Sequence, residues 1–460
     1  MKKRLMPTAI AFVVLALLLV YANYYETEEI LPPGQQKPVK IVECARNEVT
    51  AITWKRGDAD LKVAINASDT KIVAPAEYIS DQKEIDGLLR HFTELKSELI
   101  ISENATDTSV YGINASSPVV VIEAENREWQ LTLGDKTEVG GSYYLTRKDD
   151  PRVFMVPGYI NGDFVKTLDN LRDRRFFVED FGQISNISHS TPESTIELRL
   201  GDSLTDWFIG APASYPADGV AVSGLIENMR NLKIAKFIDD NPSADDDYGF
   251  ASSSLKIVVV NKDGKEITLE TGEMSGTETY VRTSGSQAIH TALTTDINNL
   301  RVTVNDLREK YLSVPAYAEL TELTVADASG SITVERKGDK WLVGDQLVAE
   351  RDVKDFVLAA DRARVNVFGN LEKLEKHGLA KKEQCRTIEI KSNTERLMLW
   401  LGMRDGANLS AMSDNELLIM TIELDDAFKT FMRRLRQPSE ETKTVVSTSD
   451  TPTVATDTNQ

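Results

Sequence analysis

Apolar side chains recur at three places along the chain with the spacing of one buried helical stripe. The spacing i, i+3, i+4, i+7 puts them on one face of a helix and predicts an amphipathic helix at each place. The second stripe begins 137 residues after the first and the third 131 residues after the second, which indicates an internal repeat. The three stripes are Ile85, Leu88, Leu89, Phe92 and Leu95; Val222, Leu225, Ile226, Met229 and Leu232; and Val353, Phe356, Val357, Ala360 and Ala363.

Each predicted helix is followed by the same series of smaller features. A glycine comes after an aromatic residue or a histidine, and alternating apolar residues then predict a strand with one buried face. A polar turn and a returning strand follow, and the returning strand ends in the pattern Leu-x-x-Gly. In chain order the glycine pairs are Tyr111-Gly112, Tyr248-Gly249 and His377-Gly378, and the Leu-x-x-Gly segments are 131–134, 269–272 and 399–402.

A second helical stripe and an arginine close each repeat. The stripes are Phe164, Leu168 and Leu171; Leu300, Val304 and Leu307; and Phe428, Met432 and Leu435. The arginines that follow are Arg172, Arg308 and Arg436. A cation at the carboxyl end of a helix complements the helix dipole and can bind the last carbonyl groups. The alternative that stays open is a basic contact for a partner protein, present three times.

The series predicts three tandem α+β repeats, at residues 46–177, 178–314 and 315–437. In each repeat, strands, a helix, a hairpin with further strands and a second helix follow one another. Antiparallel hairpins dominate and strands do not alternate with helices, so an α+β fold fits better than a doubly wound sheet. Matching positions in the opening strands hold Ile72, Trp207 and Trp341.

The first 45 residues predict a membrane anchor and a stalk. Residues 5–25 carry no charged side chain, and the first charge after them is Glu26. As a helix they reach about 30 Å, which is enough to cross the hydrocarbon core of a bilayer. The preceding basic residues favour the cytoplasmic side. A cleaved signal peptide is the alternative, although residues 21–25 are bulky where the peptidase needs small side chains. We expect a basic end and uncleaved transmembrane helix within residues 1–25 and a proline-rich stalk at 26–45.

The charge balance excludes nucleic acid as a partner. The chain has 53 basic and 72 acidic side chains, a formal net charge of −19, whereas nucleic-acid binding needs a basic face. Residues 438–460 are polar without apolar periodicity and predict a disordered tail. The tail and the basic amino terminus cancel in charge, so the acidic excess lies in the repeats, which anionic lipid headgroups would repel.

The sequence carries no strong catalytic or cofactor motif. The patterns GxxxxGK[ST], GxGxxG, HExxH, CxxC and GxSxG are absent. Ser80 and Lys83 have the Ser-x-x-Lys spacing of penicillin-binding acyl enzymes without their other motifs, and Ser80-Asp81 predicts a helix N-cap instead. We therefore expect no enzymatic activity, no cofactor and no metal site.

The remaining polar residues are expected to be structural. The acidic cluster of Asp239, Asp240 and 245–247 predicts a solvated loop, with a weak calcium site as the alternative. Cys44 and Cys385 would meet an oxidising compartment, and whether they pair stays open. The histidines form no constellation, and their expected places are beside a buried stripe, in a polar loop, near a strand end and in the aromatic position before a glycine: His91, His189, His290 and His377.

The order of these motifs resembles the domain of unknown function 4340 family. The resemblance is clearest in the first repeat, from Val110-Tyr111-Gly112-Ile113 through segment 129–134 to Ser142-Tyr143-Tyr144-Leu145. Members of this family are typically membrane-anchored bacterial proteins without assigned enzymatic activity or established catalytic residues. Their genes often lie beside those of ABC-type transporter components of the gliding-motility kind, so the resemblance implies an accessory role.

The anchor and the repeats, together with what this resemblance implies, predict a non-enzymatic accessory protein that assists an ABC-type transporter or a gliding-like envelope assembly through protein–protein contacts. Its expected place is the bacterial inner membrane, with one span and the bulk of the chain on the periplasmic side. Its expected partners are transporter membrane subunits or other envelope proteins. The alternative is a module that binds envelope polysaccharide or a lipid-linked ligand, with Tyr143, Tyr144 and Tyr280 stacking on sugars.

Overall fold

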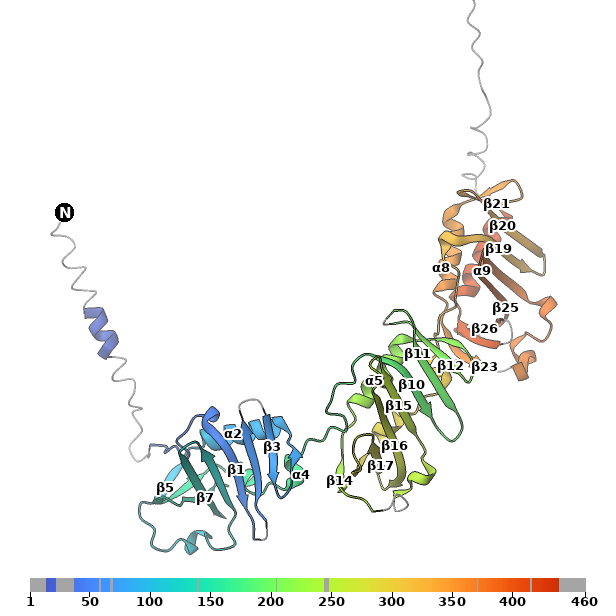
Figure 1. Cartoon of the computed structure of the whole chain (residues 1–460). Coiled ribbons are helices and arrows are strands. Elements are labelled where there is room, and N and C mark those ends of the chain that lie inside the picture. The colour runs from blue at the N-terminus through green and yellow to red at the C-terminus, as the bar shows by residue number, and fades with distance from the viewer. Residues whose placement is uncertain are drawn as a thin grey trace, which may run out of the picture. The chain divides into compact units, whose positions relative to one another are not determined.

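Three antiparallel sheets make up the described part of the chain (Figure 1). The computed structural model describes residues 14–21 and 37–437, except 58, 67–68, 139, 204, 244–247, 370 and 414–415. Within these residues each sheet has nine strands, and one sheet lies in each of the three predicted repeats. The prediction of three repeated α+β units is therefore confirmed.

The strand order is the same in the three sheets, so equivalent strands can be compared by their place. The first sheet has the order β4-β3-β2-β1-β6-β7-β8-β9-β5, the second β13-β12-β11-β10-β15-β16-β17-β18-β14 and the third β22-β21-β20-β19-β24-β25-β26-β27-β23. One outer edge is thus formed by β4, β13 or β22, and the other by β5, β14 or β23.

The strands have the following bounds. The first sheet comprises β1 (Val49–Lys55), β2 (Leu61–Asn66), β3 (Asp69–Ala74), β4 (Tyr78–Ile79), β5 (Leu99–Ser102), β6 (Val119–Ala124), β7 (Arg127–Lys136), β8 (Tyr143–Arg147) and β9 (Asp150–Val156). The second comprises β10 (Ile184–Ser190), β11 (Thr195–Leu200), β12 (Trp207–Ala211), β13 (Tyr215–Ala217), β14 (Lys236–Asp239), β15 (Lys256–Asn261), β16 (Glu266–Ser275), β17 (Glu278–Thr283) and β18 (Ile289–Leu293). The third comprises β19 (Leu320–Asp327), β20 (Gly330–Lys337), β21 (Lys340–Val343), β22 (Gln346–Val348), β23 (Val365–Gly369), β24 (Arg386–Ser392), β25 (Arg396–Asp405), β26 (Asn408–Ser413) and β27 (Glu416–Thr421).

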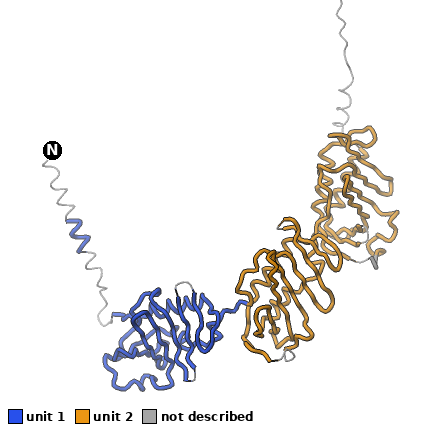
Figure 2. Tube along the Cα trace, in the orientation of Figure 1, with its two compact units in different colours: residues 1–175 blue, residues 176–460 orange. Residues whose placement is uncertain are grey.

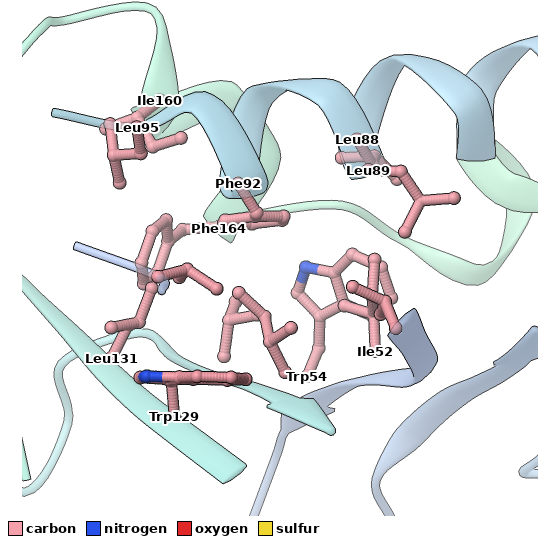
Figure 3. Close-up of a cluster of buried hydrophobic side chains, with 14 of the residues drawn as sticks. Ile52, Trp54, Leu88, Leu89, Phe92, Leu95, Trp129, Leu131, Ile160 and Phe164 are labelled. Carbon is pink, nitrogen blue, oxygen red and sulfur yellow. The ribbon is translucent and has the colours of Figure 1, made fainter. Parts of the chain in front are cut away.

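One amphipathic helix packs on each sheet and buries the predicted stripe. These helices are α2 (Gln82–Glu94), α5 (Gly219–Arg230) and α8 (Glu350–Asp361). Figure 3 shows Leu88, Leu89 and Phe92 of α2 directed toward Trp54 and Trp129 of the first sheet. The opening-strand positions are also core positions, because Ile72, Trp207 and Trp341 are all buried.

In the first two repeats, the predicted second helix is interrupted. There it is split into two short helices, whereas the third repeat has one long helix. Thr167 and Thr303 begin the second short helix with capping boxes to Asn170 and Asp306, while the matching position in the third repeat is Phe431, which has no capping hydroxyl. The helices are α3 (Ile160–Phe164) and α4 (Leu168–Leu171); α6 (Thr294–Asn298) and α7 (Val304–Leu307); and α9 (Glu423–Arg436).

The carboxyl end of the predicted stalk belongs to the first repeat. Ile41, Val42 and Cys44 are buried in its core, and the Ile41 amide donates to the Leu95 carbonyl at 2.9 Å. Their apolar side chains explain why this segment packs instead of extending as a stalk. Residues 26–36 of the predicted stalk lie outside the described residues.

Residues 14–21 are helical and lie within the predicted anchor at 5–25. The other anchor residues are not among those described. No helix in the described part of the chain is both long and apolar enough to cross a membrane.

The chain divides into two compact units, residues 1–175 and 176–460 (Figure 2). The first contains the first sheet, and the second contains the second and third sheets.

Candidate functional site

The aromatic-glycine and Leu-x-x-Gly motifs lie against each other in every repeat. The glycine of Leu-x-x-Gly lies against the carbonyl group of the aromatic residue or histidine of the other motif. A Cβ atom on this glycine would overlap with the carbonyl oxygen. The distances would be 2.3 Å from Gly134 to Tyr111, 2.1 Å from Gly272 to Tyr248 and 2.2 Å from Gly402 to His377. The second glycine of the motif therefore allows a loop and a strand to touch through their backbones.

The first glycine of the motif accommodates a bulge in the strand. Gly112 has φ 71°, and a Cβ atom there would lie 2.1 Å from Cγ of Asp135. The pairing of β7 with β8 shifts register between Leu133 and Lys136, next to this aspartate. The same register shift occurs between β16 and β17 and between β25 and β26. The motifs that define the repeat thus lock a loop onto a bulge, which is a structural role.

Beside this contact, two tyrosine side chains pack together in the first two repeats, and both are replaced in the third repeat. Tyr111 and Tyr144 pack with ring centroids 5.1 Å apart, and Tyr248 and Tyr280 do the same at 5.1 Å. In the third repeat His377 Nδ1 lies 2.9 Å from the Ser410 hydroxyl, so a hydrogen bond replaces the ring contact. His377 thus holds the aromatic position of the motif through a hydrogen bond, and its expected packing role stays a prediction.

Arg172 and Arg308 each lie over an aromatic ring. Each arginine follows a four-residue helix and itself has an extended backbone conformation. The guanidinium carbon of Arg172 lies 4.1 Å from the centroid of the Tyr78 ring, and that of Arg308 lies 3.7 Å from the Tyr215 ring. Each of these arginines thus has a cation–π contact in addition to its place at the end of a helix. A tyrosine three residues before the helix-capping aspartate occurs in both repeats, and this shared signal was missed in the sequence.

Arg308 connects the second repeat to the third. Its two terminal nitrogens donate to the carboxylate oxygens of Glu416 at 2.5 and 2.9 Å, and its other ring contact is with Phe368 at 3.9 Å. The arginine side chain is 11% exposed and the glutamate 29%. We call Arg308, Tyr215, Phe368 and Glu416 the Arg308 joint. It is held by a bidentate ion pair between two ring faces.

The backbone beside Arg308 bridges the edges of the two sheets. Arg308 pairs with Ala217 at the β13 edge, and three residues later Tyr311 pairs with Arg364 before β23. The Val365 amide donates to the Lys310 carbonyl at 2.6 Å. The linker is thus fixed by backbone hydrogen bonds at both ends.

A groove of about 1000 Å³ opens beside this joint. Besides the joint residues, its polar lining includes the charged residues Glu309, Glu395 and Arg396 and the hydroxyl groups of Tyr311, Ser313 and Ser413. Arg396 donates to Glu389 at 2.5 Å. The groove offers mixed charge and aromatic edges, and among its described lining residues no hydrogen bond joins a serine hydroxyl to a carboxylate.

Arg436 has a different setting from the other two arginines. It is the last residue of α9, and it donates to the Asp327 carboxylate at 2.6 and 2.9 Å. Its side chain is 36% exposed, whereas Arg172 is buried. A partner contact at Arg172, Arg308 and Arg436 stays a prediction, and Arg436 is the most accessible of the three.

The candidate acyl-enzyme serine is a buried structural residue. The Ser80 hydroxyl donates to the Thr70 carbonyl at 2.8 Å. Asp81 caps α2 by accepting from the amides of Lys83 and Glu84, so the predicted N-cap is confirmed and is provided by the aspartate.

The acidic cluster is only partly within the described residues. Asp239 accepts from the Tyr248 hydroxyl at 3.2 Å, while residues 245–247 lie outside. Among the described residues there is no group of three or more His, Cys, Asp or Glu side chains able to hold a metal. Cys44 and Cys385 both have free thiols, and burial raises the pKa of each.

His189 corrects the sequence prediction, which placed it in a polar loop. It lies in β10, is fully buried, and its Nε2 is 2.9 Å from the Leu300 carbonyl oxygen. Burial lowers the pKa of this imidazole. Because polar serines and an asparagine flank it in sequence, the period of the strand was not visible there.

His91 and Asp163 form a pair that the sequence did not suggest. His91 Nδ1 lies 2.8 Å from the buried carboxylate of Asp163. Burial raises the pKa of this carboxyl group, and the hydrogen bond from His91 opposes the rise. The pair joins α2 to α3, and the aspartate backbone accepts from Trp54 Nε1 at 2.7 Å. The two residues are 72 positions apart, so only the tertiary fold brings them together.

Comparison with protein-family models gives two matches to "Domain of unknown function (DUF4340)", at residues 71–206 and 207–382. The first match begins in β3 and the second at the start of β12, which are equivalent strands of successive sheets. No curated protein and no solved structure matches the chain. The two matches cover more than half of the 460 residues, and the chain therefore belongs to the DUF4340 family.

Proposed function

We propose that this chain is a non-enzymatic accessory protein, anchored in the bacterial inner membrane, that acts outside the cytoplasm through protein–protein contacts. In this proposal it assists an ABC-type transporter or a gliding-like envelope assembly. The observation that carries the proposal is that the repeated motifs are structural. Gly112, Gly134 and their counterparts allow the close contact between a loop and a strand in each repeat. What is repeated three times is a packing arrangement, as expected of a modular scaffold.

Two further observations support this proposal. The charge-free run at residues 5–25 has the length of a membrane span. The linker between the second and third repeats is fixed at both ends by backbone pairing and by the Arg308 joint. A fixed linker suits a protein that presents its second and third repeats to a partner in one arrangement.

The proposal is tested by purifying the tagged full chain from membranes in mild detergent and identifying the co-purifying proteins. A variant that keeps residues 1–36 and lacks residues 37–460 is the matched control, because it retains the predicted anchor without the repeats and without the tail. Enrichment of a transporter membrane subunit with the full chain over the control supports the proposal. Equal recovery of membrane subunits in the two samples, or recovery of none, contradicts it.

The polysaccharide-binding alternative receives less support from the tyrosines on which it relied. Tyr144 and Tyr280 pack on Tyr111 and Tyr248, and Tyr143 packs partly buried against the first core. Sugar stacking needs a free ring face. Retention of the full chain on immobilised envelope polysaccharide, without co-purifying membrane proteins, would favour this alternative.

A further inference from the structure

The outer edge formed by β4, β13 or β22 is closed in the first two repeats by the residues that follow the last short helix. In the first repeat the Asp81 amide donates to Leu171 at 2.8 Å and the Asp173 amide donates to Ile79 at 2.9 Å. In the second repeat the equivalent bonds run from Asp218 to Leu307 at 2.8 Å and from Glu309 to Pro216 at 3.0 Å. The edge strand thus gains a short extended neighbour in both repeats.

The equivalent edge of the third repeat has no such neighbour within the described residues. β22 pairs with β21 alone, and none of the isolated bridges involves it. Leu347 and Ala349 hold the places of Ile79 and Asp81, and within the described part the Ala349 amide makes no backbone hydrogen bond. The cause is α9, which continues through Phe431 where the first two repeats start a new short helix.

A cleft of about 110 Å³ takes the place of the missing neighbour. It is lined by β22, by the first turn of α8 and by the end of α9, including Leu435 and Gln437. The last described residue at this end of the chain, Gln437, therefore lies at the cleft. An exposed sheet edge of this kind accepts an extended segment through main-chain hydrogen bonds.

We propose that residues 442–448 of this chain, Thr-Lys-Thr-Val-Val-Ser-Thr, add a strand to the outer edge of β22. Five of these seven residues are β-branched, the composition that suits a strand. Residues 438–441 provide a connection of four residues, about 13 Å when extended, from the point where α9 ends at the cleft. Segment 451–456 is a poorer candidate because Pro452 lacks an amide donor.

The amino-terminal segment of a second copy fits this edge less well. Lys40 pairs with Lys96 on the first repeat at the place where Tyr311 pairs with Arg364 on the third. Residue 38 therefore corresponds to Glu309, whose amide donates to the β13 edge. Because residue 38 is a proline, it cannot make this bond.

Hydrogen exchange of the full chain in detergent tests the proposal. The amide of Ala349 and the peptide that covers β22 are compared in the native chain, in a chain that stops at Gln437, and in the double variant V445P/V446P. We expect exchange about tenfold slower in the native chain than in both variants. The variant A455P changes the tail outside the proposed strand and should exchange like the native chain.

Three results would overturn the proposal. The first is equal exchange at Ala349 in the native and truncated chains. The second is loss of protection in A455P as large as in V445P/V446P, which would place the contact elsewhere in the tail. The third is protection that disappears on dilution, since the strand would then come from another molecule. The Asp218 amide, which is bonded within the second repeat, reports in every sample that the chain remains folded.

Discussion

Individual glycines explain the motifs by which the repeats are recognised. The Tyr111 carbonyl oxygen lies where a Cβ atom of Gly134 would point. Gly112 has a positive φ, and the Asp135 side chain lies where its Cβ atom would point. Both positions exclude a Cβ atom for a geometric reason. The sequence shows that such glycines recur, but only the fold shows that the two of them meet.

We predict that Gly134→Ala destabilises the first repeat by about 2 kcal/mol, because the new methyl group forces backbone atoms apart. The control is Gly87→Ala in helix α2, where a Cβ atom meets nothing within 4 Å. That change should stabilise the repeat by up to about 1 kcal/mol, since alanine is the better helix former. Hydrogen exchange of the β7 amides measures both effects. Similar protection in the two variants would show that the close contact has no energetic weight.

His189 gives the second repeat a pH dependence of known sign. Burial lowers its pKa below the ordinary value of 6.5, so folding favours the neutral ring. The stability that depends on the neutral ring is fully present above pH 6.5 and is lost as the pH falls through the lowered pKa. We predict that His189→Gln, which keeps a donor for the Leu300 carbonyl, loses less stability than the native chain between pH 7.5 and pH 5. Thermal unfolding at each pH measures this, and parallel profiles for the two proteins would contradict it.

At the scale of elements, the linker between the second and third repeats depends on Arg308. The bidentate pair with Glu416 and the two ring faces need the planar guanidinium group. We predict that Arg308→Lys weakens the joint by about 2 kcal/mol. Exchange of the Val365 amide, which is bonded to Lys310 across the linker, should become about thirtyfold faster. The exposed pair of Arg404 with Asp426 is the control.

Arg404→Lys should leave the exchange of Val365 unchanged, because both side chains of that pair are about half exposed. An equal effect of the two substitutions would mean that the loss of any arginine nearby loosens the third repeat. No effect of Arg308→Lys would mean that the backbone bridges alone hold the linker.

The elements also show how far the sequence can predict the structure. The stripes of α2, α5 and α8 were predicted because a buried face imposes its period on the residues. The break between α6 and α7 was missed, although Thr303 and Asp306 carry the capping-box signal. Glu416 was missed because it lies 108 residues from Arg308 and in another repeat. Contacts between repeats leave no periodic trace, whereas packing within a repeat leaves the same trace three times.

At the scale of the molecule, the net charge of −19 and the three repeats are consistent with a scaffold that meets proteins. The acidic excess lies in residues 26–437, because the tail and the amino terminus cancel. In the proposed membrane-anchored arrangement, repulsion from anionic headgroups would favour contacts of the repeats with proteins over contacts with the lipid surface.

The proposed accessory function is tested most directly by crosslinking in intact cells with a lysine-reactive reagent, followed by purification of the chain and mass spectrometry. The account predicts crosslinks from lysines within residues 46–437 to extracytoplasmic segments of a transporter membrane subunit or another envelope protein. Crosslinks from these lysines to cytoplasmic proteins, or within the chain alone, would contradict it.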